Sequence, residues 1–281
     1  MKEKIELSKV REFGDIISDS FVIIRQNFKP LIISYLVICG MFIVTGVLVT
    51  VVAQWRQVEE GSPGLFSFWN ITSLLFQMVE YTAIILTTIS YLAIYKQKDN
   101  QPPTLLEVWE YFKFYFLRVF GAQVVLTIGL FFGILFCFLP GIYLSPVFAL
   151  VTPIIIIENT NLEYAIRKAF RIIKENWWFT FGVIFLLSII VGMGLLVFFI
   201  PAVIFYGGSQ WLTGNSFDTT FNTIQAIIFN AGQVLWLLPI IAVTLVYYSL
   251  TEHSEGSSLV NRIKMFGKTD SPSDQFPTEQ Y

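Results

Sequence analysis

One acidic residue, Glu80, stands inside a long apolar stretch of the sequence at 69–95. Placing a charged carboxylate in the hydrocarbon core of a bilayer costs about 2.5–3.5 kcal/mol on insertion scales. No lysine or arginine lies at a comparable depth in any other apolar stretch. We therefore expect Glu80 to be protonated or to be hydrogen-bonded by neutral partners. An ionisable residue at this depth is by default a hypothesis for a functional site.

Polar residues from two helices are expected to surround Glu80. Gln77 shares its helical face, and Asn230 and Gln233 lie at a similar depth in the last apolar stretch, 222–250. The functional interpretation is a proton or cation relay, or the polar end of a substrate cavity. The alternative is a polar contact that only holds the helices together. A single acid without a charged partner favours that alternative.

The composition excludes several classes of protein. The chain of 281 residues is 55% hydrophobic and only 14% charged, whereas soluble domains carry about a quarter charged residues. A soluble enzyme, a disordered chain and a nucleic-acid binder are therefore excluded. One histidine and two cysteines leave little for metal or disulfide chemistry, and no catalytic motif is present. We expect no cofactor, no metal site and no enzymatic activity.

The apolar stretches indicate an integral membrane protein, because a helix of roughly 20 apolar residues crosses a bilayer. Pro140-Gly141 is a turn signal that separates the third and fourth stretches into a tight hairpin. Gly129 and Gly133 form a small-residue motif, which favours close packing within the chain over dimerisation. The predicted spans are 30–53, 69–95, 119–138, 142–157, 178–205 and 222–250, followed by a polar tail at 251–281.

The positive charges indicate how the chain is oriented. Of its 18 lysines and arginines, all except Arg56 fall in alternate segments between the predicted spans. Positively charged segments stay in the cytoplasm. Both termini are therefore predicted to be cytoplasmic, with the protein in the bacterial cytoplasmic (inner) membrane. The first 29 residues lack the apolar core of a signal peptide.

Each odd-numbered span is preceded by a segment with amphipathic helical periodicity. Thr104 with Glu107, and Thr160 with Glu163, fit the capping box of a helix start. These helices lie in the headgroup plane or pack on the inner ends of the spans. The apolar positions are Val10, Phe13, Ile17, Phe21, Ile24 and Phe28, then Leu105, Val108, Phe112, Tyr115 and Val119, then Leu162, Ile166, Ala169, Ile173 and Trp177.

The fold class that follows is an all-α integral membrane protein with six transmembrane helices and three cytoplasmic amphipathic helices. It consists of three repeats of an interfacial helix followed by two spans. In the third amphipathic segment Arg167, Arg171 and Lys174 lie on the polar face. We expect these three residues, the basic collar, to face lipid phosphate, water or a partner protein.

The residues from 140 to 182 carry a family resemblance. They read PGIYLSPVFALVTPIIIIENTNLEYAIRKAFRIIKENWWFTFG, with Pro-Gly opening a span, Glu158 after an aliphatic run, and a basic amphipathic helix ending in Asn176-Trp177-Trp178. This stretch resembles the membrane domain attached to some bacterial glycerophosphodiester phosphodiesterases, and related stand-alone multi-span proteins. The resemblance implies no catalysis, because the phosphodiesterase barrel with its paired histidines is absent and His253 is the only histidine.

Two functions remain after these exclusions. The first is a non-enzymatic subunit or scaffold of a membrane or envelope complex, with membrane lipids and other membrane proteins as partners and no nucleic acid. The second is a transporter or lipid-handling protein that uses the polar cluster around Glu80. The missing catalytic motifs and small extramembrane segments favour the first, and the Glu80 cluster and the internal repeat favour the second.

Overall fold

The computed structural model describes residues 6–59, 67–136, 138–213 and 219–256, and this part of the chain is helical with short connections. Six of its helical segments are long and apolar enough to cross a membrane. These observations confirm the predicted class, an all-α integral membrane protein. The polar tail predicted from residue 251 lies outside the described residues beyond 256.

The first amphipathic segment and the first span form one kinked helix, α1 (Phe13–Glu59). The kink is at Asn27, whose φ of −110° and ψ of 16° are not helical. Pro30 follows it, and a proline ring removes one backbone donor and clashes with the carbonyl four residues earlier. The Asn27 side chain donates to the Ile23 carbonyl at 3.2 Å, which satisfies a carbonyl group in the kinked turn. The interfacial helix therefore bends into the first span without a loop.

Helix α2 (Phe68–Gln97) is the centre of the bundle. It packs along α1 and also contacts α3, α4 and α8. From Glu80 to Tyr95 every residue except Tyr81 is buried. A helix that is apolar on all sides in this half belongs inside a bundle, surrounded by protein instead of lipid. Any polar group on this half of α2 must therefore find its partners inside the protein.

Helices α3 (Leu105–Phe136) and α4 (Phe138–Ile157) form the predicted hairpin. The capping box at Thr104 is confirmed: its backbone amide donates to Glu107 Oε2 at 2.7 Å, and its hydroxyl accepts from the Glu107 amide at 3.4 Å. Helix α3 ends at Phe136 and α4 begins at Phe138, so the predicted turn at Pro140-Gly141 is wrong. Both residues lie in the first turn of α4, where proline is tolerated.

Glycines allow the two arms of this hairpin to approach closely. A Cβ on Gly133 would lie 3.4 Å from the Gly141 Cα, and one on Gly141 would lie 2.4 Å from the Ile134 Cγ1. A Cβ on Gly129 would meet Phe148 at 3.3 Å. Both glycines of the small-residue motif thus face the chain's own α4, as expected for packing within one molecule.

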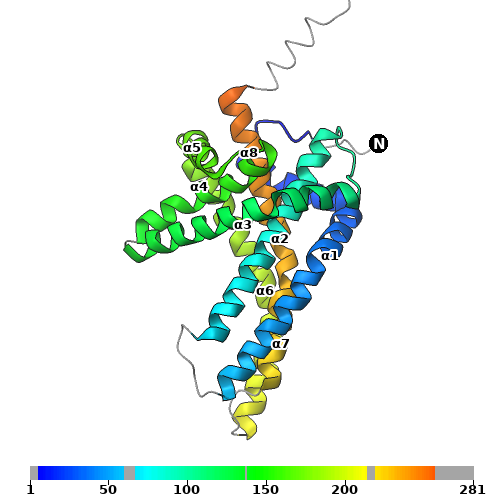
Figure 1. Cartoon of the computed structure of the whole chain (residues 1–281), viewed down its shortest axis with the longest axis vertical. Helices are drawn as coiled ribbons and strands as arrows, with labels where there is room; N and C mark the ends of the chain where they lie inside the picture. The colour runs from blue at the N-terminus through cyan, green and yellow to red at the C-terminus, as the bar shows by residue number, and fades with distance from the viewer. Residues whose placement is uncertain (1–5, 60–66, 137, 214–218, 257–281) are drawn as a thin grey trace, which may run out of the picture.

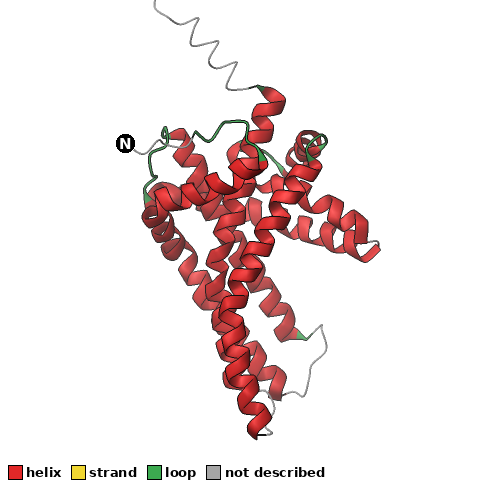
Figure 2. Cartoon of the chain, turned by 180° about the vertical axis from the view of Figure 1, so that it is seen from behind, coloured by secondary structure: helices red, strands yellow, loops and turns green. Residues whose placement is uncertain are grey.

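The α3–α4 hairpin leaves the bundle sideways. Figure 1 and Figure 2 show it projecting away from the long bundle formed by α1, α2, α6, α7 and α8, near the end of the molecule where α5 lies. Its tip is strongly exposed, with Phe136 at 83% and Leu139 at 72%.

The third amphipathic segment is a separate helix, α5 (Leu162–Ile173). The predicted cap at Thr160 is wrong: the N-cap is Asn161, whose side chain accepts from the Tyr164 amide at 3.0 Å. Before this cap, Asn159 has a left-handed φ of 51° that ends α4 and turns the chain. Asparagine tolerates this conformation better than most residues, which explains why the turn shifts the helix start by one position.

The last predicted span is broken in its middle. After α6 (Trp177–Thr213), the chain forms α7 (Thr219–Gly232), the 3₁₀ turn η1 (Gln233–Trp236) and α8 (Leu237–Glu255). Pro239 has no backbone N–H for the Leu235 carbonyl, so the regular α-helical ladder cannot continue through this point. A 3₁₀ stretch inside a long helix often marks a functional hinge. The break lies at the depth of the polar cluster predicted around Glu80.

Candidate functional site: a buried carboxylate at a helix break

The structure brings three of the four residues of the predicted cluster into the interior. Glu80 is 0% exposed, Asn230 is 1% exposed and Gln233 is 8% exposed. Glu80 lies in α2, Asn230 lies in the last turn of α7, and Gln233 opens η1. Gln77, the fourth residue, lines a cavity next to the cluster. The carboxylate is therefore held where α1, α2 and the broken last span meet.

Gly46 of α1 makes room for the carboxylate, and the sequence pattern did not reveal this. A Cβ on Gly46 would lie 2.7 Å from Glu80 Oε2 and 3.3 Å from Asn230 Oδ1. Any side chain at this position would therefore push against the carboxyl group. Because both oxygens lie close to this one position, Glu80 and Asn230 approach one another beside the α1 backbone.

Three oxygen acceptors in this cluster lack a donor. Glu80 Oε1, Glu80 Oε2 and Asn230 Oδ1 are buried without a hydrogen-bond partner. The Asn230 amide nitrogen donates to the Ala226 carbonyl at 2.8 Å, so the Asn230 oxygen is the atom left for Glu80. Gln233 lies close to the carboxylate, but no hydrogen bond of ordinary geometry joins them. Buried acceptors without donors need a proton, a cation or water between them.

A cavity of about 510 Å³, lined by four polar and five apolar residues, ends one helical turn from this cluster. It lies between α1, α2, α6 and α7, toward the end of the bundle where α1 stops and α2 begins. Thr50, Gln77 and Ala226 line it, and they stand one turn from Gly46, Glu80 and Asn230, respectively. The other lining residues are Gln54, Leu195, Leu196, Phe199, Gln225 and Phe229.

Further polar groups follow the α1–α2 interface from Glu80 toward the opposite end of the bundle. Two turns from Glu80 and Gly46, the Cys39 sulfur and the Thr87 hydroxyl lie 3.4 Å apart. The same antiparallel register brings Tyr35 level with Tyr91 one turn further on, and the Tyr35 hydroxyl is buried without a partner. We call these residues, together with Asn27, the polar file. At its end the Tyr91 hydroxyl donates to Asn27 Oδ1 at 3.2 Å, beside the kink of α1.

The basic collar lies on the surface, as its periodicity indicated. Arg167, Arg171 and Lys174 are exposed. Arg167 also pairs with Glu163 at 2.9 Å, with both side chains largely exposed. Such a pair contributes about 0.3–0.5 kcal/mol. These three basic groups are therefore accessible to lipid phosphate or to a partner.

A buried ion pair on the same helix was not predicted. The Lys168 side chain is 6% exposed, and its Nζ lies 2.9 Å from Oε1 of Glu158. The Tyr247 hydroxyl of α8 donates to the same carboxylate oxygen. This contact anchors α5 to the end of α4 and to α8. The visible signal was Glu158 at the end of an aliphatic run, but nothing in the sequence indicated which lysine would pair with it.

Comparisons with known proteins identify no relative of this chain. No family model, no curated protein and no solved structure matches the chain. The resemblance of residues 140–182 to the membrane domain of glycerophosphodiester phosphodiesterases therefore stays a prediction. Among the described residues, no group of three or more histidine, cysteine, aspartate or glutamate side chains is placed to hold a metal ion.

Proposed function

We propose that this integral membrane protein is a proton-translocating transporter in which Glu80 binds the proton in the middle of the membrane. The observation that carries the proposal is the set of three unpaired acceptors at Glu80 and Asn230, next to a cavity that is partly lined by polar side chains. A contact that only held helices together would have its polar groups paired, because an unsatisfied buried group costs about 1–3 kcal/mol. A proton on Glu80 supplies the missing donor for the Asn230 oxygen.

The polar file favours a proton over a metal cation as the translocated ion. A hydroxyl group both accepts and donates a hydrogen bond, so a chain of hydroxyl groups and water can pass a proton along. Thr87, Tyr35 and Tyr91 supply one hydroxyl group each, and Cys39 adds a thiol, which is a weaker donor and acceptor. A dehydrated metal cation needs several oxygen ligands at every step, and these isolated groups do not provide them. Chains of polar residues through a bundle are typical of proton relays.

The break at η1 supplies the element that can move during a transport cycle. A 3₁₀ stretch in the middle of a long helix often marks a functional hinge. Here Asn230 precedes the break and Gln233 begins it, so both groups that face Glu80 depend on its conformation. A movement of Asn230 and Gln233 relative to the Glu80 carboxylate would open or close the path between Glu80 and the cavity.

The proposed orientation places the cavity on the outer side of the bacterial inner membrane and both termini in the cytoplasm. The charge pattern supports this orientation. The N-terminal segment and the end of α8 lie at the same end of the molecule, because the Arg11 amide donates to the Ser249 hydroxyl at 2.9 Å. The cavity lies toward the opposite, charge-poor end of the bundle.

Cysteine labelling tests this orientation. With Cys39 and Cys137 replaced by alanine, a cysteine introduced at Ser67 should react with a membrane-impermeant maleimide in intact cells. A cysteine at Ser254 should react only after the cells are permeabilised, because the end of α8 faces the cytoplasm. Labelling of Ser254→Cys in intact cells would contradict the proposed orientation.

A subunit or scaffold role is the second candidate, and the α3–α4 hairpin favours it. The hairpin projects from the bundle (Figure 2), and another membrane protein can pack against its exposed aromatic side chains. They include Phe131, Phe132, Phe136 and Phe138, which are 47–83% exposed. In this role the protein would be non-enzymatic, and the hairpin would be its contact surface. Normal assembly of the protein with its partners after removal of the proton-binding group would favour this candidate.

A pair of glycine substitutions tests the transporter proposal. We expect Gly46→Ala to lower potential-driven proton uptake into proteoliposomes several-fold, because a Cβ there would lie 2.7 Å from Glu80 Oε2 and would displace the carboxyl group from its position beside Asn230. Gly40→Ala is the matched control, since a Cβ on Gly40 of the same helix meets nothing within 4 Å. Uptake would be followed with a pH-sensitive dye after a potassium diffusion potential is applied. Equal uptake by both variants, or none by the wild type, would contradict the proposal.

A further inference from the structure

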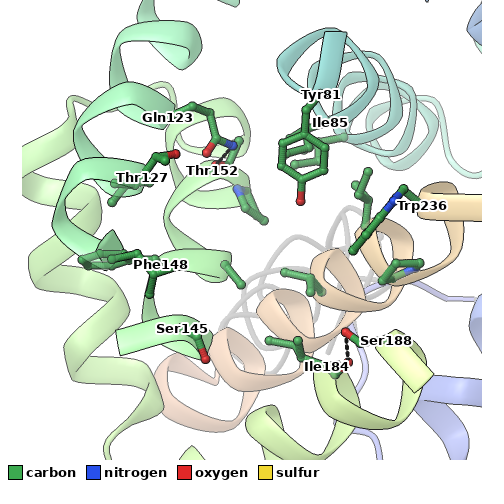
Figure 3. Close-up of a pocket in the computed structure, with 18 residues that line it drawn as sticks. Tyr81, Ile85, Gln123, Thr127, Ser145, Phe148, Thr152, Ile184, Ser188 and Trp236 are labelled. Carbon is green, nitrogen blue, oxygen red and sulfur yellow. Dashed lines mark hydrogen bonds between the residues drawn. The ribbon is translucent and has the colours of Figure 1, made fainter. Parts of the chain in front are cut away.

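A second pocket lies on the other side of α2, in the angle between the α3–α4 hairpin and the bundle. We call it the crook pocket. Its volume is about 260 Å³, and Figure 3 shows its walls. Tyr81 directly follows Glu80 in α2, so the crook pocket and the proton site lie on different faces of the same helical turn. The pocket is lined from α2, α3, α4, α6, η1 and α8.

The chemistry of the crook pocket suits an uncharged ligand. None of its lining residues is charged, and most are apolar. Neutral polar groups face the cavity from two sides: Figure 3 shows the Tyr81 hydroxyl and the Trp236 ring opposite Gln123. The Gln123 amide donates to the Thr152 hydroxyl at 3.3 Å, which leaves the amide oxygen as an acceptor for a ligand. An ionised ligand would find no opposite charge here and would have to be desolvated at high cost.

The pocket borders surfaces that meet the hydrocarbon of the bilayer. Ile128 follows the lining residue Thr127 and is 51% exposed, while Phe185 and Ile189 flank the lining residues Ile184 and Ser188 at 55% and 42% exposed. In an integral membrane protein, apolar side chains exposed at this level face lipid tails. A ligand that reaches the crook pocket along this surface therefore comes from within the membrane.

The crook pocket and the proton site are joined by η1 and by the turn of α2 that contains Glu80 and Tyr81. Trp236 ends the same 3₁₀ turn that Gln233 begins, and Gln233 lies beside Glu80. The Trp236 and Tyr81 rings pack edge to face, with centroids 6.0 Å apart. A ligand that separates or tightens these two rings acts on both η1 and α2. Either movement changes the surroundings of the carboxylate.

We infer that the crook pocket binds an uncharged amphiphile from the bilayer, with hydrocarbon chains and a hydroxyl or ester group, as in a diacylglycerol. Its hydrocarbon part packs against the apolar residues that line the pocket. Its polar group forms a hydrogen bond with Gln123, Thr127 or Tyr81. Occupancy changes the geometry of η1 and so the proton uptake at Glu80. Only this last step rests on the proposed function.

Photocrosslinking in reconstituted vesicles tests the binding. The full chain would be placed in vesicles of phosphatidylethanolamine and phosphatidylglycerol that contain a trace of diacylglycerol with a diazirine in one acyl chain. Crosslinks should fall in peptides that contain residues 123–153 or 236–243. Ala149→Trp, which fills the cavity, should reduce them by about tenfold, the effect of losing about 1.4 kcal/mol of binding free energy. Leu135→Trp is the matched control, because Leu135 is 64% exposed on the same hairpin and does not line the pocket.

Two more measurements distinguish loss of ligand binding from misfolding of the variant and from nonspecific lipid contact. Thr127→Val keeps the shape of the side chain and should weaken crosslinking even if Ala149→Trp does not fold. A phosphatidic acid probe with the same acyl chains should crosslink less at these peptides. Equal crosslinking of Ala149→Trp and Leu135→Trp, or a preference for phosphatidic acid, would overturn the inference. Crosslinking of Glu80→Gln at the same peptides would support the inference whether or not that variant takes up protons, so a loss of proton uptake there bears on the proposed function alone.

Discussion

Glu80→Gln is expected to abolish potential-driven proton uptake while the protein stays folded. Glutamine has nearly the shape of glutamic acid. Its amide can donate a hydrogen bond to the Asn230 oxygen, which has no donor in the wild-type structure. It cannot release a proton, so the step that the proposal assigns to this position is lost. Uptake would be measured in proteoliposomes beside the wild type, and folding by gel filtration and thermal unfolding in detergent.

Glu80→Leu separates this role from a purely structural one. Leucine removes all hydrogen bonding at a fully buried position and leaves the Asn230 oxygen without a donor. We expect a stability loss of about 1–3 kcal/mol, the cost of an unsatisfied buried polar group. If Glu80→Gln retains wild-type uptake while Glu80→Leu unfolds the protein, the cluster only holds helices together, and the transporter proposal fails.

Lys168→Ala is expected to destabilise the protein by about 3–5 kcal/mol, because it leaves the Glu158 carboxylate mostly buried without its positive partner. The contact joins α5, α4 and α8, so its loss should loosen the charged end of the bundle. The effect would be measured as a lower midpoint of thermal unfolding in detergent.

Arg167→Ala is the matched control for this substitution. It removes the neighbouring basic residue of the same helix, whose ion pair with Glu163 is largely exposed. We expect a change of less than about 1 kcal/mol. Equal midpoints for Lys168→Ala and Arg167→Ala would show that the buried pair does not stabilise the fold.

The sequence predicted the parts of the fold that depend on local composition. Apolar stretches of sufficient length identified the candidate spans, and amphipathic periodicity identified α5. The depth of Asn230 and Gln233 in the last span predicted their approach to Glu80, because helices that run in the same direction bring residues of equal depth together. The break at η1 was visible only as Pro239, since proline in a span bends some helices and merely interrupts one hydrogen bond in others.

The missed features depend on what lies opposite a residue in space. Gly46 is one of 18 glycines in the chain, and only the neighbouring helix reveals that its missing side chain makes room for a carboxylate. Lys168 lies next to the exposed Arg167 in a basic segment, and only packing against α4 and α8 distinguishes them. The close approach of α3 and α4 depends on glycines that face the opposite arm of the hairpin, which composition does not specify.

The protonation state of Glu80 in the membrane is the most direct test of the central claim. A hydrophobic carbodiimide modifies protonated carboxyl groups in apolar surroundings, and mass spectrometry of the peptide that contains Glu80 would quantify the product as pH and sodium concentration are varied. Because the proposal assigns a proton to this site, we expect modification of Glu80 that decreases as pH rises and does not change with sodium. Protection of Glu80 by sodium at constant pH, or no modification at any pH at which the protein is folded, would contradict it.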